Sequence, residues 1–207
     1  MEELSARDIR HLFDRLNAEL ARTGVVGEVY LVGGAVMCLV FDARLTTMDV
    51  DAFFRPAREV REAARRVNFG TDWLNDAVKG FLSERGEFHP CLELPNLRVL
   101  TAAPEYLLAM KCMAMRIGRE FHDIDDVRFL LRYLNLTGLD ATLEIIGRYY
   151  PVERIPQKTI YALEEMFART SPDPATRSPG QAHRKTAGDE LEHAGSALAA
   201  ESPEGER

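Results

Sequence analysis

Two apolar segments, one ending in a glycine pair and the next carrying two aspartates, constrain the fold of this chain most. Residues 28–34 end in Gly-Gly, and residues 47–54 read Thr-Met-Asp-Val-Asp-Ala-Phe-Phe. Side chains at positions i and i+2 of a β-strand lie on the same face. We therefore expect Asp49 and Asp51 to project together from a strand whose alternate residues pack into the core.

The same segments predict a site for a metal-bound phosphate. Two neighbouring carboxylates repel each other unless a cation lies between them, and Mg²⁺ or Mn²⁺ prefers oxygen ligands. Gly33 and Gly34 have no Cβ, so their backbone N–H groups can approach an anion closely. We predict that Asp49 and Asp51 bind the metal. The alternative is a plain glycine turn with two solvent-facing aspartates at a sheet edge.

The order of these segments resembles the signature of the DNA polymerase β-like nucleotidyltransferase superfamily. The matching residues are Val32-Gly33-Gly34, a spacer of fourteen residues, and Asp49-Val50-Asp51-Ala52. A second pattern is similar to that of the AbiEii-type toxin branch, in an uncharacterised subgroup; it runs from Lys111 through Ala114 and Arg116 to Asp123 and Asp126. The resemblance covers residues 25–135, and His122 stands where the branch has Arg or Lys.

The resemblance implies transfer of a nucleoside monophosphate from a nucleoside triphosphate to an acceptor hydroxyl, with release of pyrophosphate. It also implies Mg²⁺ or Mn²⁺ ions held by shared carboxylates. The implied catalytic residues are Asp49, Asp51, Lys111 and Asp126, of which Asp49 and Asp51 are the metal ligands. The implied nucleotide-binding residues are Gly33, Gly34, Thr47, Lys111 and Asp123.

For several of these residues, other roles stay open. Lys111 lies in an apolar stretch, where it needs an anionic partner unless it snorkels from the exposed side of a helix. Asp123 and Asp126 share one helical face, which also suits a capping carboxylate and surface ion pairs. Glu93, in Leu-Glu-Leu, is either a third metal-binding carboxylate or an ordinary edge-strand glutamate. Arg116 also fits a role in packing between helices.

An arginine-rich helix is expected after the two aspartates. Arg58, Arg61 and Arg65 would share one face, which suits RNA phosphates. Glutamates interleave with these arginines, so a solvated, self-paired helix is the favoured account of the pattern. Trp73 and Asn75 are predicted to be core and turn residues, with base stacking or sugar contact as the alternative.

Hydrophobic periodicity predicts an α/β (α+β) fold, with a mixed sheet and flanking helices followed by a helical half. A Ser-x-x-Asp signal at Ser5 opens an amphipathic helix that ends near Gly24. The expected strands are 28–32, 48–54, 91–94 and 97–100. The expected helices besides the first are a short one after Gly34 and those near 56–68, 72–84, 104–114, 124–134, 139–149 and 157–168.

Three regions follow from this pattern: a catalytic region over 1–102, a helical region over 103–170 and a disordered tail over 171–207. The tail contains no aromatic, Val, Ile or Met residue. Such a segment cannot bury enough apolar surface to offset the entropy of ordering it.

Composition indicates a cytoplasmic enzyme with no membrane span. The chain has 207 residues, 46% of them hydrophobic, and a net charge of −7, which argues against a protein that coats nucleic acid. Its three cysteines form no C-x-x-C and are expected to be reduced thiols. No apolar run approaches the length of about 18 residues that a membrane span requires.

The leading hypothesis is a metal-dependent nucleotidyltransferase. By resemblance, the acceptor is a tRNA or protein hydroxyl, and the protein is a toxin neutralised by a cognate antitoxin. Two alternatives remain open: nucleotidyl transfer to a small molecule, and a degenerate fold that binds a nucleotide or a partner without catalysis.

Overall fold

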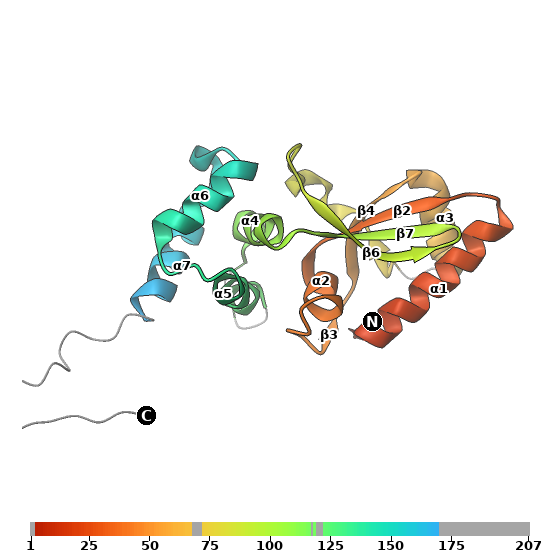
Figure 1. Cartoon of the computed structure of the whole chain (residues 1–207), viewed down its shortest axis with the longest axis horizontal. Helices are drawn as coiled ribbons and strands as arrows, with labels where there is room; N and C mark the ends of the chain where they lie inside the picture. Colours follow the sequence, from red (N-terminus) through yellow and green to blue (C-terminus); the bar gives the residue numbers. More distant parts are fainter. Residues whose placement is uncertain (1–2, 68–71, 117, 119–121, 170–207) are drawn as a thin grey trace, which may run out of the picture. The chain divides into compact units, whose positions relative to one another are not determined.

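A computed structural model describes residues 3–67, 72–116, 118 and 122–169. These residues form a mixed α/β fold with a five-stranded sheet, a small two-stranded sheet and seven α-helices (Figure 1). The predicted fold class is therefore confirmed. The predicted disordered tail lies outside the described residues.

The main sheet has the strand order β5-β4-β2-β7-β6 and mixes both strand orientations. The central strand β2 pairs parallel to β7 and antiparallel to β4, β4 pairs parallel to β5, and β6 and β7 form an antiparallel hairpin. The bounds of the strands are β2 (Gly27–Leu31), β4 (Val50–Arg55), β5 (Leu74–Asn75), β6 (Phe88–Leu94) and β7 (Leu97–Ala102), with β1 (Leu4–Ser5) and β3 (Thr46–Thr47) in the small sheet.

The helices begin before the sheet and continue after it. The Ser5 side chain caps α1, and Asp8 returns the bond to the Ser5 backbone, as the sequence predicts. After β7 only helices follow within the described residues. The helical elements are α1 (Ala6–Arg22), α2 (Gly33–Leu39), α3 (Ala57–Val67), α4 (Pro104–Ala114), α5 (Asp123–Tyr133), α6 (Leu139–Tyr149) and α7 (Gln157–Ala168), with 3₁₀ turns η1 (Ala77–Phe81) and η2 (Val152–Arg154).

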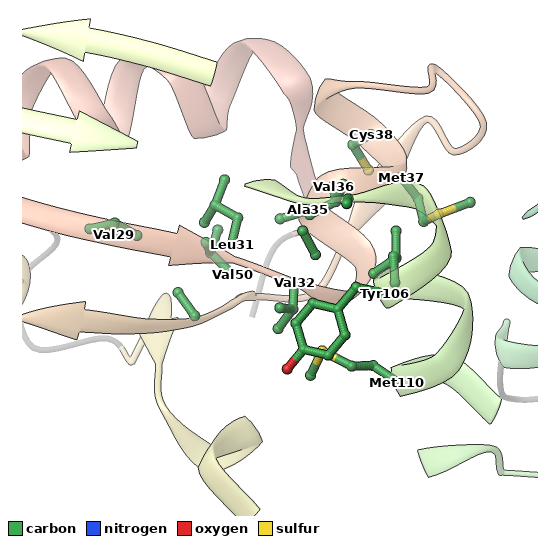
Figure 2. Packing of buried hydrophobic residues seen from close by; sticks show 14 of the residues in the cluster. Val29, Leu31, Val32, Ala35, Val36, Met37, Cys38, Val50, Tyr106 and Met110 are labelled. Atoms are coloured by element: carbon green, nitrogen blue, oxygen red, sulfur yellow. The ribbon is translucent and has the colours of Figure 1, made fainter. Parts of the chain in front are cut away.

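The core lies between the sheet and its covering helices. Alternate residues of β4 are buried, and α2 and α3 contact this strand, while α1 contacts α3 and β7. Figure 2 shows Leu31 and Val50 close together within this core, with Val29 further back along β2, and it shows Tyr106 and Met110 of α4 beside Val32. The apolar contacts of α4 therefore fix this helix at the end of β2, where the glycine pair begins.

Residues 72–84 depart from the sequence prediction of a short helix. The Val50 N–H donates to the Trp73 carbonyl oxygen at 2.8 Å, and this bond draws the segment to the sheet edge as β5 before the η1 turn begins. Trp73 itself is 2% exposed and donates to the Ala64 carbonyl oxygen, which confirms it as a core residue. In this segment the pairing of β5 with β4 outweighs the local preference for a helix.

Asp49 also lies elsewhere than predicted. The strand begins at Val50, so Asp49 occupies the bend before β4 instead of the strand itself. Its side chain is therefore placed by contacts outside the sheet ladder.

Candidate functional site

The glycine pair brings the backbone against side chains that the sequence predicts for the site. Gly33 has a φ of +66°, and a Cβ on it would lie 2.7 Å from Asp51 Oδ2. A Cβ on Gly34 would meet Thr47 Oγ1 and would lie 2.8 Å from Arg44 Nη1. Any larger residue at either position would displace these side chains, so both glycines are required by close approach.

The two aspartates form a strained electrostatic pair at the start of β4. The Val32 N–H donates to the Asp51 carbonyl oxygen at 3.0 Å, which ties the end of β2 to Asp51. Burial, and next the negative charge of Asp49, raises the pKa of the Asp51 carboxyl above its ordinary value. An oxygen donor pair with unfavourable negative charge suits a hard divalent cation. Asp49 and Asp51 therefore fit the Mg²⁺ or Mn²⁺ that their resemblance implies.

Asn75 is a site residue that sequence reasoning assigned to a turn. It pairs with Asp51 across the β4–β5 register, and its Nδ2 donates to Asp49 Oδ2 at 2.7 Å. The signal that could have revealed it is the apolar pair 73–74 directly before it, which marks an edge strand ending in a polar side chain.

Five charged side chains form a row of ion pairs in which the sign of the charge alternates. We call this row the charge ladder, and its members in order are Arg44, Asp126, Lys111, Asp123 and Arg116. Lys111 Nζ lies 2.6 Å from Asp126 Oδ2 and 3.3 Å from Asp123 Oδ1. Arg44 Nη1 lies 3.3 Å from Asp126, and Arg116 Nε lies 3.0 Å from Asp123. Lys111 is only 9% exposed, so the snorkelling interpretation is wrong. Arg116 serves the ladder by binding the first residue of α5.

The ladder keeps Asp123 ionised despite its position in the interior. Burial alone would raise its pKa, but the hydrogen bond from Arg116 and the charge of Lys111 outweigh burial and lower that pKa below the ordinary value. The hydrogen bond from Arg116 to Asp123 also raises the pKa of the Arg116 guanidinium. The site therefore contains fixed positive charge close to the aspartate pair.

A cavity of about 370 Å³ connects the ladder with the aspartate pair. Its polar lining is formed by Gly33, Asp51, Lys111, Arg116 and Asp123. The rest of the lining is apolar and consists of Val32, Ala77, Val78, Phe81, Leu107, Met110 and Ala114. Such a mixed lining suits a ligand that carries both charged and apolar groups.

The other predicted residues surround this cavity without lining it. Asp49 accepts a hydrogen bond from Asn75, and the Thr47 side chain lies against Gly34. Asp126 and Arg44 line a second cavity of about 570 Å³. The structure thus brings four of the predicted residues into one cavity and the remaining four into its supporting layer.

Glu93 is not part of this site. It lies on β6, and strands β7 and β2 separate β6 from β4. Across these strands Glu93 is in register with Arg98, Glu28 and finally Arg55, which lies at the opposite end of β4 from Asp51. Three strand spacings of about 4.8 Å and four residues of about 3.3 Å along the strand separate it from Asp51. Glu93 is an edge-strand glutamate that faces Arg98 at 3.6 Å.

The arginines of α3 are engaged in ion pairs. Arg58 lies 3.0 Å from Glu59, and Arg66 lies 3.0 Å from Glu19 on α1. Arg61 pairs with Asp76, directly after β5. Of these three pairs, only the Arg58 pair lies within α3, while Arg61 and Arg66 reach the residue after β5 and helix α1, so self-pairing within the helix is confirmed for Arg58 alone.

Comparisons of the chain with protein-family models, with curated proteins and with solved structures found no match. Among the described residues, no helix combines the length and apolar character needed to cross a membrane. Within the same residues, no group of three or more His, Cys, Asp or Glu side chains is arranged to hold a metal ion. A functional assignment therefore depends on the geometry of the aspartate pair, the ladder and the cavity.

Proposed function

We propose that this protein is a metal-dependent nucleotidyltransferase that moves a nucleoside monophosphate from a nucleoside triphosphate to a hydroxyl of RNA or protein. The observation that carries the proposal is the meeting of Gly33, Asp51 and Lys111 in one cavity, although they come from three separate elements. A close-approaching backbone, a carboxylate pair and a buried cation are the groups that a metal–triphosphate requires.

The mixed lining of the cavity supports a nucleotide as the ligand. Lys111 and Arg116 offer cationic donors to the phosphates, and Phe81 and Met110 offer an apolar surface to the base. A volume of about 370 Å³ lies within the range of small-molecule sites. In this pose we assign the α-phosphate to Asp51, because Asp51 lines the cavity and is a proposed metal ligand.

The proposed reaction needs no covalent enzyme intermediate. The acceptor hydroxyl oxygen bonds to the α-phosphorus, the bond from that phosphorus to the bridging oxygen of pyrophosphate breaks, and the hydroxyl proton passes to the Asp51 carboxylate. Asp49 and Asp51 would hold divalent ions, which would supply positive charge to neutralise the phosphoryl oxygens. Lys111 and Arg116 orient the triphosphate, while Asp123 and Asp126 hold Lys111 in place.

Transfer of label from α-³²P nucleoside triphosphates tests the proposal. Each of the four nucleotides is incubated separately with the protein, Mg²⁺ or Mn²⁺, and bacterial RNA or protein extract. We expect label in one acceptor class, and we expect Asp51→Asn to reduce it more than about 100-fold because it removes a charge acting on the transition state. Asp140→Asn is the matched control, since Asp140 is an exposed aspartate on α6.

Each outcome of this assay has a defined meaning. Label that resists treatment with protease but not ribonuclease identifies an RNA hydroxyl, and the reverse identifies a protein hydroxyl. Label that is equal for wild type and Asp51→Asn contradicts the proposed role of the aspartate pair. No label with any nucleotide, metal and extract contradicts transfer to a macromolecule.

A further inference from the structure

We propose that Asn75 is a positioning residue that orients Asp49 and takes the place of a third carboxylate in the divalent-cation site. This inference rests on the proposed function, because it concerns the same pair of aspartates. It assigns a role to a side chain that the sequence places in a turn, and it defines the charge of the site.

The hydrogen bonds of Asn75 determine which of its atoms faces Asp49. Asn75 Oδ1 accepts the backbone N–H of Ala77 at 3.2 Å, and Nδ2 lies 2.7 Å from Asp49 Oδ2. A backbone N–H can only donate, so the amide oxygen must face Ala77 and the amide nitrogen must face Asp49. Asn75 therefore acts on the site as a donor.

The position of Asn75 in the sheet explains why Asp49 needs this donor. Strand β4 begins at Val50, so Asp49 lies in the preceding bend. Asn75 lies on β5 directly opposite Asp51 in the register. Its side-chain amide hydrogen-bonds Asp49 and also Asp51, so it holds the two carboxylates within one site.

A neutral donor at this position has an electrostatic consequence. It occupies one oxygen of Asp49 without adding a negative charge to a pair that already repels. The remaining carboxylate oxygens of Asp49 and Asp51 then carry two formal charges for binding a cation. Because ligand charge sets cation affinity, we infer modest affinity for the free ion and tighter loading of the ion together with a triphosphate.

Two substitutions separate the positioning role from the turn. Asn75→Asp keeps an oxygen acceptor for the Ala77 N–H and nearly the same size, but it replaces the donor with a negative oxygen. Asn75→Ala removes both bonds. The control is Asn135→Asp, which adds the same charge at an exposed residue outside the site, where a φ of 54° suits Asn and Asp alike.

The first measurement is the affinity of the full chain for Mn²⁺ without nucleotide, with electron paramagnetic resonance as the readout of binding. We expect Asn75→Ala to weaken Mn²⁺ binding about tenfold, as loss of the partner that orients a metal ligand commonly does. Asn75→Asp loses the same donor but adds a charge, so we expect it to bind Mn²⁺ about tenfold more tightly than Asn75→Ala. Without metal, Asn75→Asp should lower the melting temperature by about 3 °C relative to wild type, and Mn²⁺ should raise the melting temperature of Asn75→Asp by more than that of Asn75→Ala. Asn135→Asp should match wild type.

The outcomes distinguish this inference from the proposed function. Wild-type Mn²⁺ binding that neither Asn75 substitution changes overturns the role of Asn75 and leaves the nucleotidyltransferase proposal intact. Mn²⁺ binding by Asn75→Asp that is no tighter than that by Asn75→Ala also overturns it, because the added carboxylate then does not lie where it can bind the ion. If Asn75→Ala fails to fold, the rise in the melting temperature of Asn75→Asp on addition of Mn²⁺ decides. Wild type that binds no Mn²⁺, with or without a nucleotide analogue, overturns both proposals.

Discussion

Lys111 shows how one side chain joins the folding of the helical region to the chemistry of the cavity. It lies one residue after Met110 on α4, in a helix whose other buried residues are mostly apolar. Its ammonium reaches two buried carboxylates on α5 and also borders the cavity. The packing of α4 against α5 therefore determines where the cation that we assign to the phosphates is held.

Removal of this cation should destabilise the fold. Lys111→Met preserves the bulk and apolar stem of the side chain but leaves Asp123 and Asp126 without their shared partner. We expect a loss of about 3 kcal/mol in the free energy of unfolding, at the low end for a broken buried pair because Arg44 and Arg116 remain. Urea denaturation measures the change, and Lys158→Met at an exposed position serves as control. A loss equal to that of the control would contradict the ladder.

The ladder also predicts a pH dependence of stability. The pKa of Asp123 is lowered in the folded state, so the folded protein binds fewer protons than the unfolded chain as the pH approaches the ordinary value of 3.8 from above. Its contribution to stability is complete above that value and is lost as the pH falls through the folded pKa. Unfolding by urea at pH 5 and pH 3 should show a smaller loss of stability on acidification for Asp123→Asn than for wild type. Equal losses would mean that Asp123 is not preferentially ionised in the fold.

At the scale of elements, the sequence predicts the parts that depend on local periodicity. The amphipathic helix from Ser5, the strands on either side of the glycine turn and the helices after Pro104 are confirmed because their apolar spacing matches the face they bury. The predicted helix over 72–84 is wrong because the structure of this segment depends on a backbone hydrogen bond to Val50, more than twenty residues earlier in the chain. No local pattern contains that information.

The residues of the candidate site likewise fall into those that local sequence predicts and those that contacts distant in sequence determine. Asp51 and Gly33 follow from a strand and a turn that are adjacent in sequence. The bond from Arg44 to Asp126 joins residues 82 positions apart, and the bond from Asn75 to Asp49 joins residues 26 positions apart. These pairs arise from the topology of the sheet and from the docking of α5. In the sequence, the spacing of these residues is the same as that of surface ion pairs.

The short turn η1 should contribute to nucleotide affinity. Phe81 is the last residue of η1, is 44% exposed and belongs to the apolar lining of the cavity. The Tyr150 hydroxyl donates to the Phe81 carbonyl oxygen at 2.5 Å. Loss of one aromatic stacking surface weakens base binding by about 1–3 kcal/mol, so Phe81→Ala should raise the nucleotide Kd by about 5-fold to about 150-fold.

Calorimetric titration with a non-hydrolysable triphosphate measures this effect. Tyr161→Ala removes an aromatic side chain that is 62% exposed on α7, and it should leave the Kd unchanged. An unchanged Kd for Phe81→Ala would mean that the base lies elsewhere.

For the whole molecule, the aspartate pair creates a conflict between stability and function. The raised pKa of Asp51 means that the fold disfavours its ionised form, while the proposed reaction requires that form. Without metal, Asp51→Asn should therefore be more stable than wild type by about 1 kcal/mol, a usual gain when a functional strain is relieved.

Addition of Mg²⁺ should reverse this order, and the reversal separates a cation site from a merely strained pair. An ion that binds only the folded protein adds about 2.7 kcal/mol of stability at a hundredfold excess over its Kd. Wild type should gain this stability and Asp51→Asn should not, so their melting temperatures should cross as Mg²⁺ is added. Differential scanning calorimetry in EDTA and in increasing Mg²⁺ measures both curves, with Asp140→Asn expected to follow wild type throughout. Parallel curves for wild type and Asp51→Asn would mean that Mg²⁺ does not bind at the pair.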